Sequence, residues 1–352
     1  MKYRLVCSAC GIEYNSSEAI QACRDCNAFL EVVYNGVGRM PREAEEFWDF
    51  EDLFPDGKYR HYEVGFTRLI DSVEEEGLQL KLEIGNPTRS FKDRGSVIEI
   101  AKAAEYGYKE VVCASTGNMA YSIAYYARLY GMKARVFIGG KANEDKIADI
   151  GKVGNAEIVR VKGDFNTALS LSEDYSRKRR AFLTGDFCYR KEGQKTLAYE
   201  IVLGCPEVTH IIVPVGNATL ISGMYKALAQ MKAAGAIRRM PRLVAVEAER
   251  CMPLVRAFRS GKEVRYERPK TNADAIAVGF PTFGAQALAA LEKTGGVAIA
   301  VSENEMKLAQ REFYRDYGLV AELAGVASIA AFKKLRLRRK EKAVAVISGG
   351  NV

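Results

Sequence analysis

The sequence predicts an α/β protein built on parallel sheets with helices on both faces. Short apolar runs that are typical of buried strands, such as 111–114 and 134–138, alternate along the chain with longer stretches of helix-forming residues. Two of the connecting turns are rich in small residues and directly follow a strand, which is where ligands bind in folds of this class. At 352 residues, the chain is long enough for two domains with separate cores.

The individual elements follow from the same patterns. Alternating or continuous apolar residues predict strands at 80–84, 111–114, 134–138, 156–161, 209–215, 243–248 and 343–347. Helix-forming stretches predict helices at 97–106, 119–130, 166–179 and 221–233, and a further helix that opens at Glu192. Segment 41–62 is expected to form a helix and an aromatic-rich connection that contains the only tryptophan, Trp48.

Charge and hydropathy exclude several classes of protein. The net charge of +8 is modest for this length, and much of it comes from the basic run 333–340. We expect that run at the end of a late helix, where cations are favourable, so it does not indicate a nucleic-acid partner. The sequence shows no apolar leader and no long apolar span, so we expect a cytoplasmic protein without membrane contact.

The stretch Asn-Pro-Thr-Arg-Ser-Phe-Lys-Asp-Arg-Gly, residues 86–95, places Lys92 near the start of the predicted helix 97–106. Backbone N–H groups and the helix dipole oppose a positive charge at that end of a helix. A lysine so placed loses its proton more easily, which a lysine that forms a Schiff base must do. Position alone would favour an ordinary surface lysine beside Asp93 and Arg94.

Residues 86–95 resemble the cofactor-lysine motif of the threonine synthases. Those enzymes are members of the pyridoxal-phosphate family of fold type II, together with tryptophan synthase β, cysteine synthase and threonine dehydratase. The resemblance implies two doubly wound, three-layer α/β domains and makes Lys92 the catalytic residue that bonds the cofactor. It also implies the domain limits: a leader at 1–36, a large cofactor-binding domain at 37–94 and 181–352, and a smaller α/β domain at 95–180.

The turn Ser-Thr-Gly-Asn, residues 115–118, follows the predicted strand 111–114 and precedes a helix. Alone, such a turn is most often a simple N-cap, although the amides at a helix start also suit a carboxylate. The turn resembles the Ser-Thr-Gly-Asn loop of the same family. The resemblance implies that Asn118 bonds the cofactor's 3-oxygen and that the substrate lies against Ser115, Thr116, Gly117 and Met119.

The segment Gly-Asn-Ala-Thr-Leu, residues 216–220, lies between a predicted strand and a predicted helix. Small residues let successive amides point inward, and the helix start adds positive potential, so the segment suits a phosphate. A nucleotide site is the alternative, but the sequence lacks Gly-x-Gly-x-x-Gly and Gly-Lys-Ser/Thr at this point. By resemblance, the cofactor phosphate is held by Gly216, Asn217, Ala218, Thr219 and Leu220, while Ser348 meets the pyridine nitrogen.

Four of the eight cysteines form two Cys-x-x-Cys pairs, Cys7 with Cys10 and Cys23 with Cys26, separated by twelve residues. This spacing predicts a small zinc ribbon with a closed, structural Zn²⁺ site. Two disulfides are the alternative, which a cytoplasmic location disfavours. A ribbon can also bind nucleic acid, but these residues are not notably basic, so we expect a structural role.

The resemblance implies a pyridoxal-phosphate dependent lyase, and its nearest function is threonine synthase, which makes threonine and phosphate from O-phosphohomoserine and water. The sequence departs from that pattern at Met119, Asp164 and Ser170, where a threonine, an asparagine and an arginine are usual. The closing Ser-Gly-Gly-Asn, 348–351, is more similar to threonine and serine dehydratases. A dehydratase or a β-replacement enzyme such as cysteate synthase is therefore the second hypothesis, and a non-catalytic nucleic-acid-binding or scaffold protein the third. By resemblance we also expect a homodimer.

Overall fold

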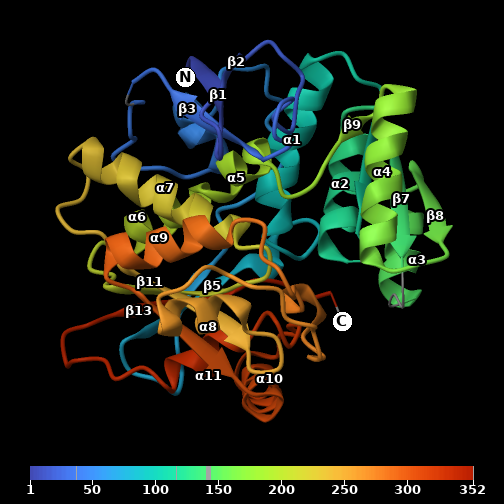
Figure 1. The fold of residues 1–352 in the computed structure, drawn as a ribbon. Helices are drawn as coiled ribbons and strands as arrows, with labels where there is room; N and C mark the ends of the chain where they lie inside the picture. Colours follow the sequence, from blue (N-terminus) through green and yellow to red (C-terminus); the bar gives the residue numbers. More distant parts are fainter. Residues whose placement is uncertain (37, 116, 140–143, 352) are drawn as a thin grey trace. The chain divides into compact units, whose positions relative to one another are not determined.

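The computed structural model describes residues 1–36, 38–115, 117–139 and 144–351. The chain divides into two compact units, the first comprising Met1–Arg39, Trp48–Val64 and Lys92–Gly193, the second comprising Met40–Phe47, Gly65–Phe91 and Gln194–Val352. Helices alternate with parallel strands in both units, which confirms the α/β class (Figure 1). The domain limits expected from the family stay a prediction.

The leader forms a three-stranded antiparallel sheet in the first unit. Its strands are β1 (Tyr3–Cys7), β2 (Glu13–Asn15) and β3 (Leu30–Tyr34), with β1 in the centre. Alternate residues of β1 are buried, as the period of a strand requires, and Leu5 pairs with Tyr14 on one side and with Val32 on the other.

The second sheet of the first unit is wholly parallel, with the order β8-β7-β6-β9. Its strands are β6 (Glu110–Ala114), β7 (Lys133–Gly139), β8 (Ala156–Val161) and β9 (Phe182–Leu183). The helices of this unit are α1 (Lys92–Glu105), α2 (Asn118–Leu129), α3 (Glu144–Lys152), α4 (Phe165–Arg179) and α5 (Cys188–Gln194).

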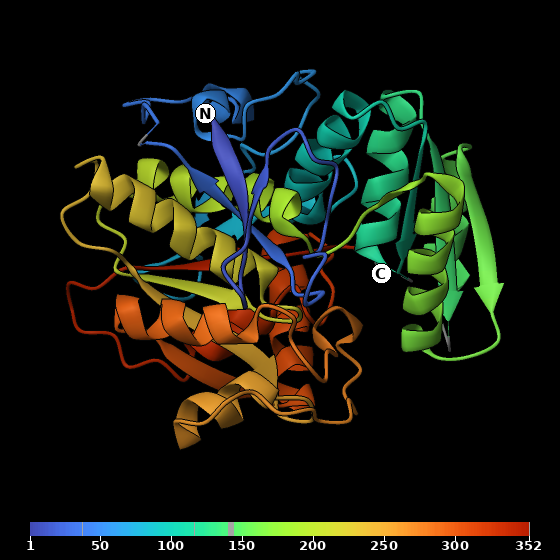
Figure 2. The same ribbon diagram turned by 45° about the horizontal axis from the view of Figure 1, so that its top comes forward.

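The chain runs outward from β6 to β8 and then returns to the other side of β6 as β9. Because crossovers between parallel strands are right-handed, this reversal puts helices on both faces of the sheet. Helix α4 packs on β6 and β7, and α2 packs on the same strands and on α1 (Figure 2). Val112, Phe137 and Ala168 form the centre of the core between the sheet and α4.

The second unit contains a six-stranded sheet with the order β12-β11-β10-β13-β5-β4. Only the edge strand β4 is antiparallel to its neighbour. The strands are β4 (Leu69–Asp71), β5 (Leu78–Leu82), β10 (His210–Pro214), β11 (Arg242–Ala248), β12 (Val297–Val301) and β13 (Ala343–Ile347). The helices are α6 (Thr196–Gly204), α7 (Thr219–Ala233), α8 (Pro253–Ser260), α9 (Gly284–Thr294), α10 (Glu303–Tyr317) and α11 (Ala327–Phe332), with short 3₁₀ turns at Glu83–Gly85 (η2) and Asp274–Ile276 (η3).

Helices cover both faces of this sheet as well. Figure 1 shows α6, α7 and α9 on one face and α10 and α11 on the other. A core cluster of the unit joins α10 and α11 to the sheet, and it includes Ile212, Val244 and Ala345. The unit is therefore a three-layer structure of the doubly wound kind.

Most predicted elements are present within one or two residues, but several details differ. Helix α1 begins at Lys92, five residues earlier than predicted. Glu192 lies near the end of α5 and does not open a helix, and the helix expected in 41–62 is only a 3₁₀ turn (η1, Phe47–Leu53).

The basic run 333–340 follows α11, which ends at Phe332, and does not form its last turn. Leu335 and Leu337 in this run are half-buried against the core, whereas Arg336 and Arg338 are exposed. Alternation with a period of two is typical of an extended segment. The run is therefore extended, because this conformation places both leucines against the core.

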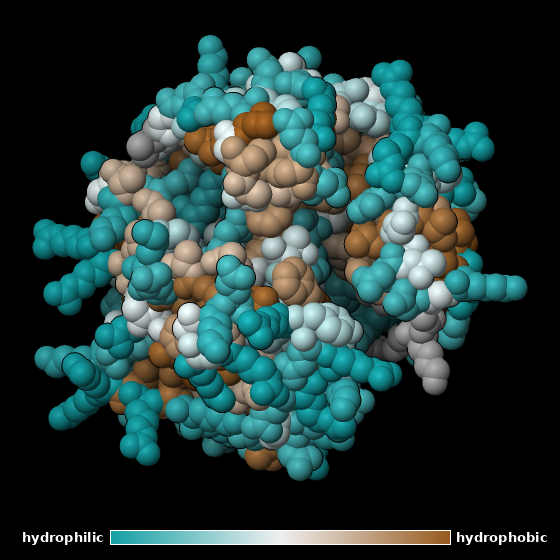
Figure 3. Space-filling model, in the orientation of Figure 1, coloured by the Kyte–Doolittle hydropathy of each residue, from teal (hydrophilic) through white to brown (hydrophobic). Residues whose placement is uncertain are grey.

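Hydrophilic residues cover most of the face seen in Figure 3, and hydrophobic residues gather there in small patches. Among the described residues, none of the helices combines the length and the apolar content needed to cross a membrane.

Candidate active site

In the second unit, the strand order reverses between β10 and β13. The chain proceeds from β10 to β11 and β12 on one side, whereas β13 and β5 lie on the other. Ligands of parallel sheets bind at the carboxyl ends of the strands at such a reversal. Segment 216–220 follows β10 and Ser348 follows β13, so the fold brings these two predicted parts of the site to the same edge.

The segment 216–220 has the geometry of an anion-binding turn. A Cβ on Gly216 would lie 2.8 Å from the carbonyl oxygen of Ala275, so a larger residue requires a backbone shift. Ala218 has the left-handed φ of 64°, and α7 begins directly after it at Thr219. Within the described residues, the amides of Gly216, Ala218 and Leu220 make no hydrogen bond. They are therefore available to a phosphate at the positive end of α7.

Ser348 is 6% exposed and is tied to the residues that precede Lys92. Its carbonyl oxygen accepts a hydrogen bond from the amide of Phe91 (3.1 Å), and Asn351 donates its side-chain amide to the carbonyl of Thr88 (2.8 Å). The segment 86–91 is thus fixed against the C-terminal segment 348–351.

The first unit has a reversal of its own, between β6 and β9. The turn after β6 carries Ser115, Gly117 and Asn118, and the hydroxyl of Ser115 accepts a hydrogen bond from the amide of Gly117 (3.4 Å). Asn118 is the buried first residue of α2, and Met119, the second, is half-buried. The prediction for Thr116 lies outside the described residues. The predicted substrate turn therefore also lies at the carboxyl edge of a sheet.

Lys92 is the first residue of α1, at the positive end of the helix dipole. Its side chain is 20% exposed, and its Nζ lies 3.8 Å from Oδ1 of Asp186, whose side chain is 8% exposed. Burial lowers the pKa of Lys92, and the like charge of Arg190 lowers it further, whereas the carboxylates of Asp186 and Glu99 raise it. The net pKa is below that of an ordinary lysine, which increases the fraction of nucleophilic free amine.

Three buried residues around Lys92 were not predicted: Asp186, Glu99 and Arg190. Arg190 and Glu99 form an ion pair of 2.6 Å in which both side chains have zero exposure. Burial raises the pKa of Glu99 to about 7, against the opposing effect of Arg190. The signal that could have found Asp186 is topological, because Asp186 follows β9 at the reversal, but a strand of two residues has no detectable period.

Asp164, one of the departures from the family pattern, has a structural role in this chain. It is the N-cap of α4, and its carboxylate accepts hydrogen bonds from the amide (3.0 Å) and the hydroxyl (2.9 Å) of Thr167. The bond from the Thr167 amide lowers the pKa of Asp164. Ser170 is exposed on the same helix. Asp164 therefore has a role as a helix cap, one that the asparagine usual in the family could also fill.

The four predicted metal ligands lie together. Their sulfur atoms are all within 4.8 Å of one another, with 3.4 Å between Cys7 and Cys26 and 3.6 Å between Cys10 and Cys23. Four Zn–S bonds of about 2.3 Å in a tetrahedron put sulfurs about 3.8 Å apart, so this set fits one Zn²⁺. The thiols are free, and a hydrogen bond with the hydroxyl of Tyr14 lowers the pKa of Cys23 to about 6, which favours the thiolate that a metal needs.

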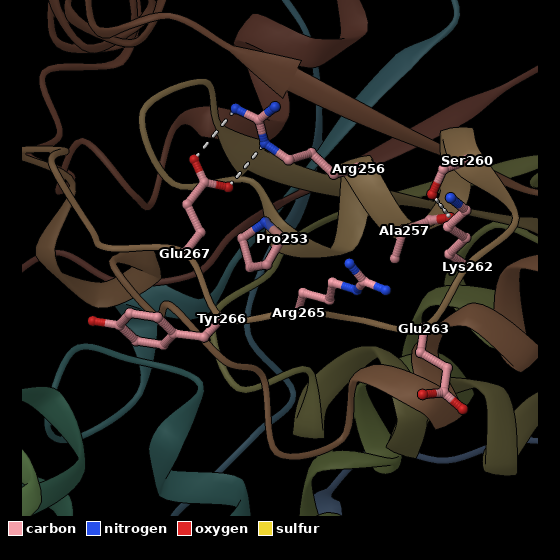
Figure 4. Close-up of a pocket in the computed structure, with 9 residues that line it drawn as sticks. All are labelled: Pro253, Arg256, Ala257, Ser260, Lys262, Glu263, Arg265, Tyr266 and Glu267. Atoms are coloured by element: carbon pink, nitrogen blue, oxygen red, sulfur yellow. Dashed lines mark hydrogen bonds and ion pairs between the residues drawn. The ribbon is translucent and has the colours of Figure 1, made fainter.

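A separate surface cavity of about 340 Å³ lies on α8 and the segment that follows it (Figure 4). Arg256 and Glu267 form an ion pair of 3.1 Å at its rim. The cavity is lined by residues of 253–267, and it includes none of the predicted site residues. We therefore do not assign it to the candidate active site.

Comparison with known proteins identifies the family of this chain. Residues 62–349 match the family described as pyridoxal-phosphate dependent enzyme. The chain is 32% identical to the threonine synthase of Methanosarcina acetivorans, over 99% of this chain and 91% of that protein. It is 34% identical to the threonine synthase of Methanocaldococcus jannaschii, over 97% of this chain and 91% of that protein.

Among solved structures, maize serine racemase superposes with a TM-score of 0.72 at 25% identity, covering 81% of this chain and 88% of that one. The family match covers most of the chain, and the two threonine synthases exceed 30% identity over nearly their whole length. The chain belongs to the family of pyridoxal-phosphate dependent enzymes that includes these threonine synthases.

Proposed function

We propose that this enzyme is a threonine synthase, a lyase that releases phosphate from O-phosphohomoserine and adds water to give threonine. The observation that supports the proposal is how much of the chain is similar to known threonine synthases. Similarity to the two methanogen threonine synthases runs over 99% and 97% of this chain, whereas the general family match begins only at residue 62. The likeness therefore includes the leader with its four cysteines.

In this proposal, Lys92 would hold the cofactor through Nζ and would serve as general base at the α-carbon of the substrate. The lowered pKa of Lys92 supports both roles, since each requires an unprotonated amine. When bound, pyridoxal phosphate supplies the electron sink for the charge left on the α-carbon.

The remaining predicted residues bind and orient. The amides of Gly216, Ala218 and Leu220 would hold the cofactor phosphate at the start of α7, and Asn118 would hold the ring oxygen. Ser348 would offer a neutral hydroxyl to the pyridine nitrogen, which suits elimination and replacement better than transamination. The turn of Ser115, Thr116 and Gly117, next to Met119, would bind the substrate carboxylate.

A dehydratase or β-replacement activity is the second candidate, and the observation that favours it is the acid beside the lysine. The carboxylate of Asp186 lies 3.8 Å from Nζ of Lys92 and would oppose a doubly charged phosphate close to that amine. A hydroxyl leaving group, as in threonine or serine, meets no such repulsion.

The decisive experiment measures products and cofactor together. The purified full-length chain is loaded with pyridoxal phosphate and incubated separately with O-phosphohomoserine, threonine and serine. We expect phosphate and threonine from the first substrate, and a visible absorbance band that disappears in Lys92→Ala but persists in Lys109→Ala, since Lys109 is an exposed lysine just after α1. Ammonia and a keto acid from threonine or serine, with no phosphate release, would establish the second candidate instead.

We also propose that Cys7, Cys10, Cys23 and Cys26 bind a structural Zn²⁺. The sulfur distances and the lowered pKa of Cys23 support a closed site with no open position for catalysis. Metal analysis of protein purified without chelator should give about one zinc per chain, and Cys23→Ser should lose it. Negligible metal in the unmodified chain would contradict this assignment.

A further inference from the structure

The guanidinium of Arg190 connects three parts of the first unit. Its Nε donates to the carbonyl of Gly185 (2.7 Å), its Nη1 to the carbonyl of Lys92 (3.3 Å) and the hydroxyl of Ser96 (3.2 Å), and its Nη2 to Glu99 (2.6 Å). Four hydrogen bonds from a side chain with zero exposure fix its position strongly. One residue of α5 thus holds both the first turn of α1 and the turn after β9.

Glu99 completes the connection from the other side. Its second carboxylate oxygen accepts a hydrogen bond from the amide of Gly185 at 2.9 Å. Gly185, the residue before Asp186, is therefore bound at its N–H by Glu99 and at its C=O by Arg190. The same two residues attach this turn to α1, because Glu99 belongs to α1 and Arg190 donates to the carbonyl of Lys92. The distance between Asp186 and the amine of Lys92 is therefore set by buried hydrogen bonds and not by the two flexible side chains alone.

We propose that Asp186 and Arg190 are positioning residues for Lys92: Arg190 with Glu99 fixes the Gly185–Asp186 turn to α1, and the carboxylate of Asp186 orients the lysine amine. The proposal rests on the proposed function, in which Lys92 bonds the cofactor. It goes beyond that function because it assigns three residues that neither the motifs nor the family resemblance indicated.

These charges also determine how readily Lys92 gives up its proton. Among the described residues, Asp186 after β9, Arg190 on α5 and Glu99 on α1 are charged groups that act on it. Removing an anion lowers the pKa of Lys92 and increases its free amine, whereas removing the cation raises its pKa. A variant that merely loosens the unit would expose Lys92 and move its pKa up towards the ordinary lysine value in every case.

The test is competitive acetylation of the full-length, cofactor-free chain at pH 8, with the modification of Lys92 measured by peptide mass spectrometry. Exposed Lys109 serves as the internal reference. We expect Asp186→Asn and Glu99→Gln to increase the relative rate at Lys92 by about threefold or more, and Arg190→Gln to decrease it by a similar factor. Asp186→Glu, which keeps the charge, should restore a rate close to that of the unmodified chain.

Because Arg190→Gln leaves Glu99 buried without its partner, melting curves must show that each variant is folded. If Arg190→Gln does not fold, the acetylation rates of Lys92 in Asp186→Asn and Glu99→Gln still test the proposal. Slower labelling in Asp186→Asn and Glu99→Gln, or unchanged rates in both, would overturn the proposal. Failure of the proposed function is seen separately, as an unmodified chain that develops no absorbance band with pyridoxal phosphate.

Discussion

Replacing Gly193 with alanine should displace helix α1 and, with it, Lys92. Gly193 lies in α5, and a Cβ on it would lie 1.8 Å from the carbonyl oxygen of Arg94 and 2.7 Å from its carbonyl carbon. Arg94 belongs to the first turn of α1, two residues after Lys92. Because both neighbouring atoms are backbone atoms, no side-chain rotation can relieve the contact.

The size of the displacement follows from the same distances. A carbon and a carbonyl oxygen in contact are about 3.3 Å apart, so the two backbones must separate by about 1.5 Å. Overpacking of this kind costs about 1–3 kcal/mol or more, which is a fall in melting temperature of roughly 1–4 °C for a chain of 352 residues. Misplacing a reacting group by about 1 Å costs on the order of a hundredfold in rate. We therefore expect activity to fall further than stability.

The assay compares kcat/KM and melting temperature of Gly193→Ala with those of Gly151→Ala. Gly151 lies in α3 of the same unit, and its nearest neighbour would be Cδ1 of Ile158 at 4.0 Å. Alanine fits there and should stabilise the helix by about 0.5–1 kcal/mol without changing activity. A folded Gly193→Ala enzyme with the activity of the unmodified chain would refute the view that close packing of α5 fixes α1.

Three further results are expected. Burial raises the pKa of Glu247 to about 8 although its carboxylate accepts the amides of Leu254 and Val255, so its contribution to stability is complete at low pH and is lost as pH rises through 8. In urea unfolding, the free energy of unfolding of Glu247→Gln, relative to that of the unmodified chain, should therefore rise by about 1 kcal/mol or more from pH 5 to pH 9. A difference that does not change with pH would contradict this. Gly216→Ala, whose methyl group would meet the Ala275 carbonyl, should weaken pyridoxal phosphate binding about tenfold in an absorbance titration, and unchanged binding would count against the phosphate turn. Removing zinc with a chelator should lower the melting temperature of the unmodified chain but not that of Cys23→Ser, which already lacks the metal.

Regular alternation made the fold predictable. Strands such as 156–161 and 343–347 are continuous apolar or alternating runs bounded by turns, and the structure has them with the same limits. The turns 115–118 and 216–220 were predicted because glycine and small polar residues directly after a buried strand are typical of ligand-binding turns in parallel sheets. Their grouping at the reversals of strand order follows from the topology, which confirms the fold class although it does not test the role of each residue.

The surroundings of Lys92 could not be predicted, for a physical reason. Arg190 and Glu99 are 91 residues apart in the sequence, and their pairing depends on the packing of α5 against α1. Charged residues are usually exposed, so a buried pair gives no periodic signal. The start of α1 at Lys92 was missed because the polar run 92–96 lacks an apolar stripe, although most of its residues are buried in the fold.

The leader contacts α5, the helix whose Arg190 is hydrogen-bonded to the carbonyl of Lys92. In the first unit, the hydroxyl of Tyr3 on β1 lies 3.0 Å from that of Tyr189 on α5, while Glu31 on β3 pairs with Lys191 and Tyr34 donates a hydrogen bond to Glu192.

Helix α5 therefore contacts the ribbon strands through 189, 191 and 192, and it contacts α1 through Arg190 and Gly193. A metal that fixes β1 and β3 would support α5 and, through it, the position of the lysine helix. Through these contacts, a metal bound by the four cysteines would have a structural role inside the enzyme, and that role would not require the ribbon to bind nucleic acid.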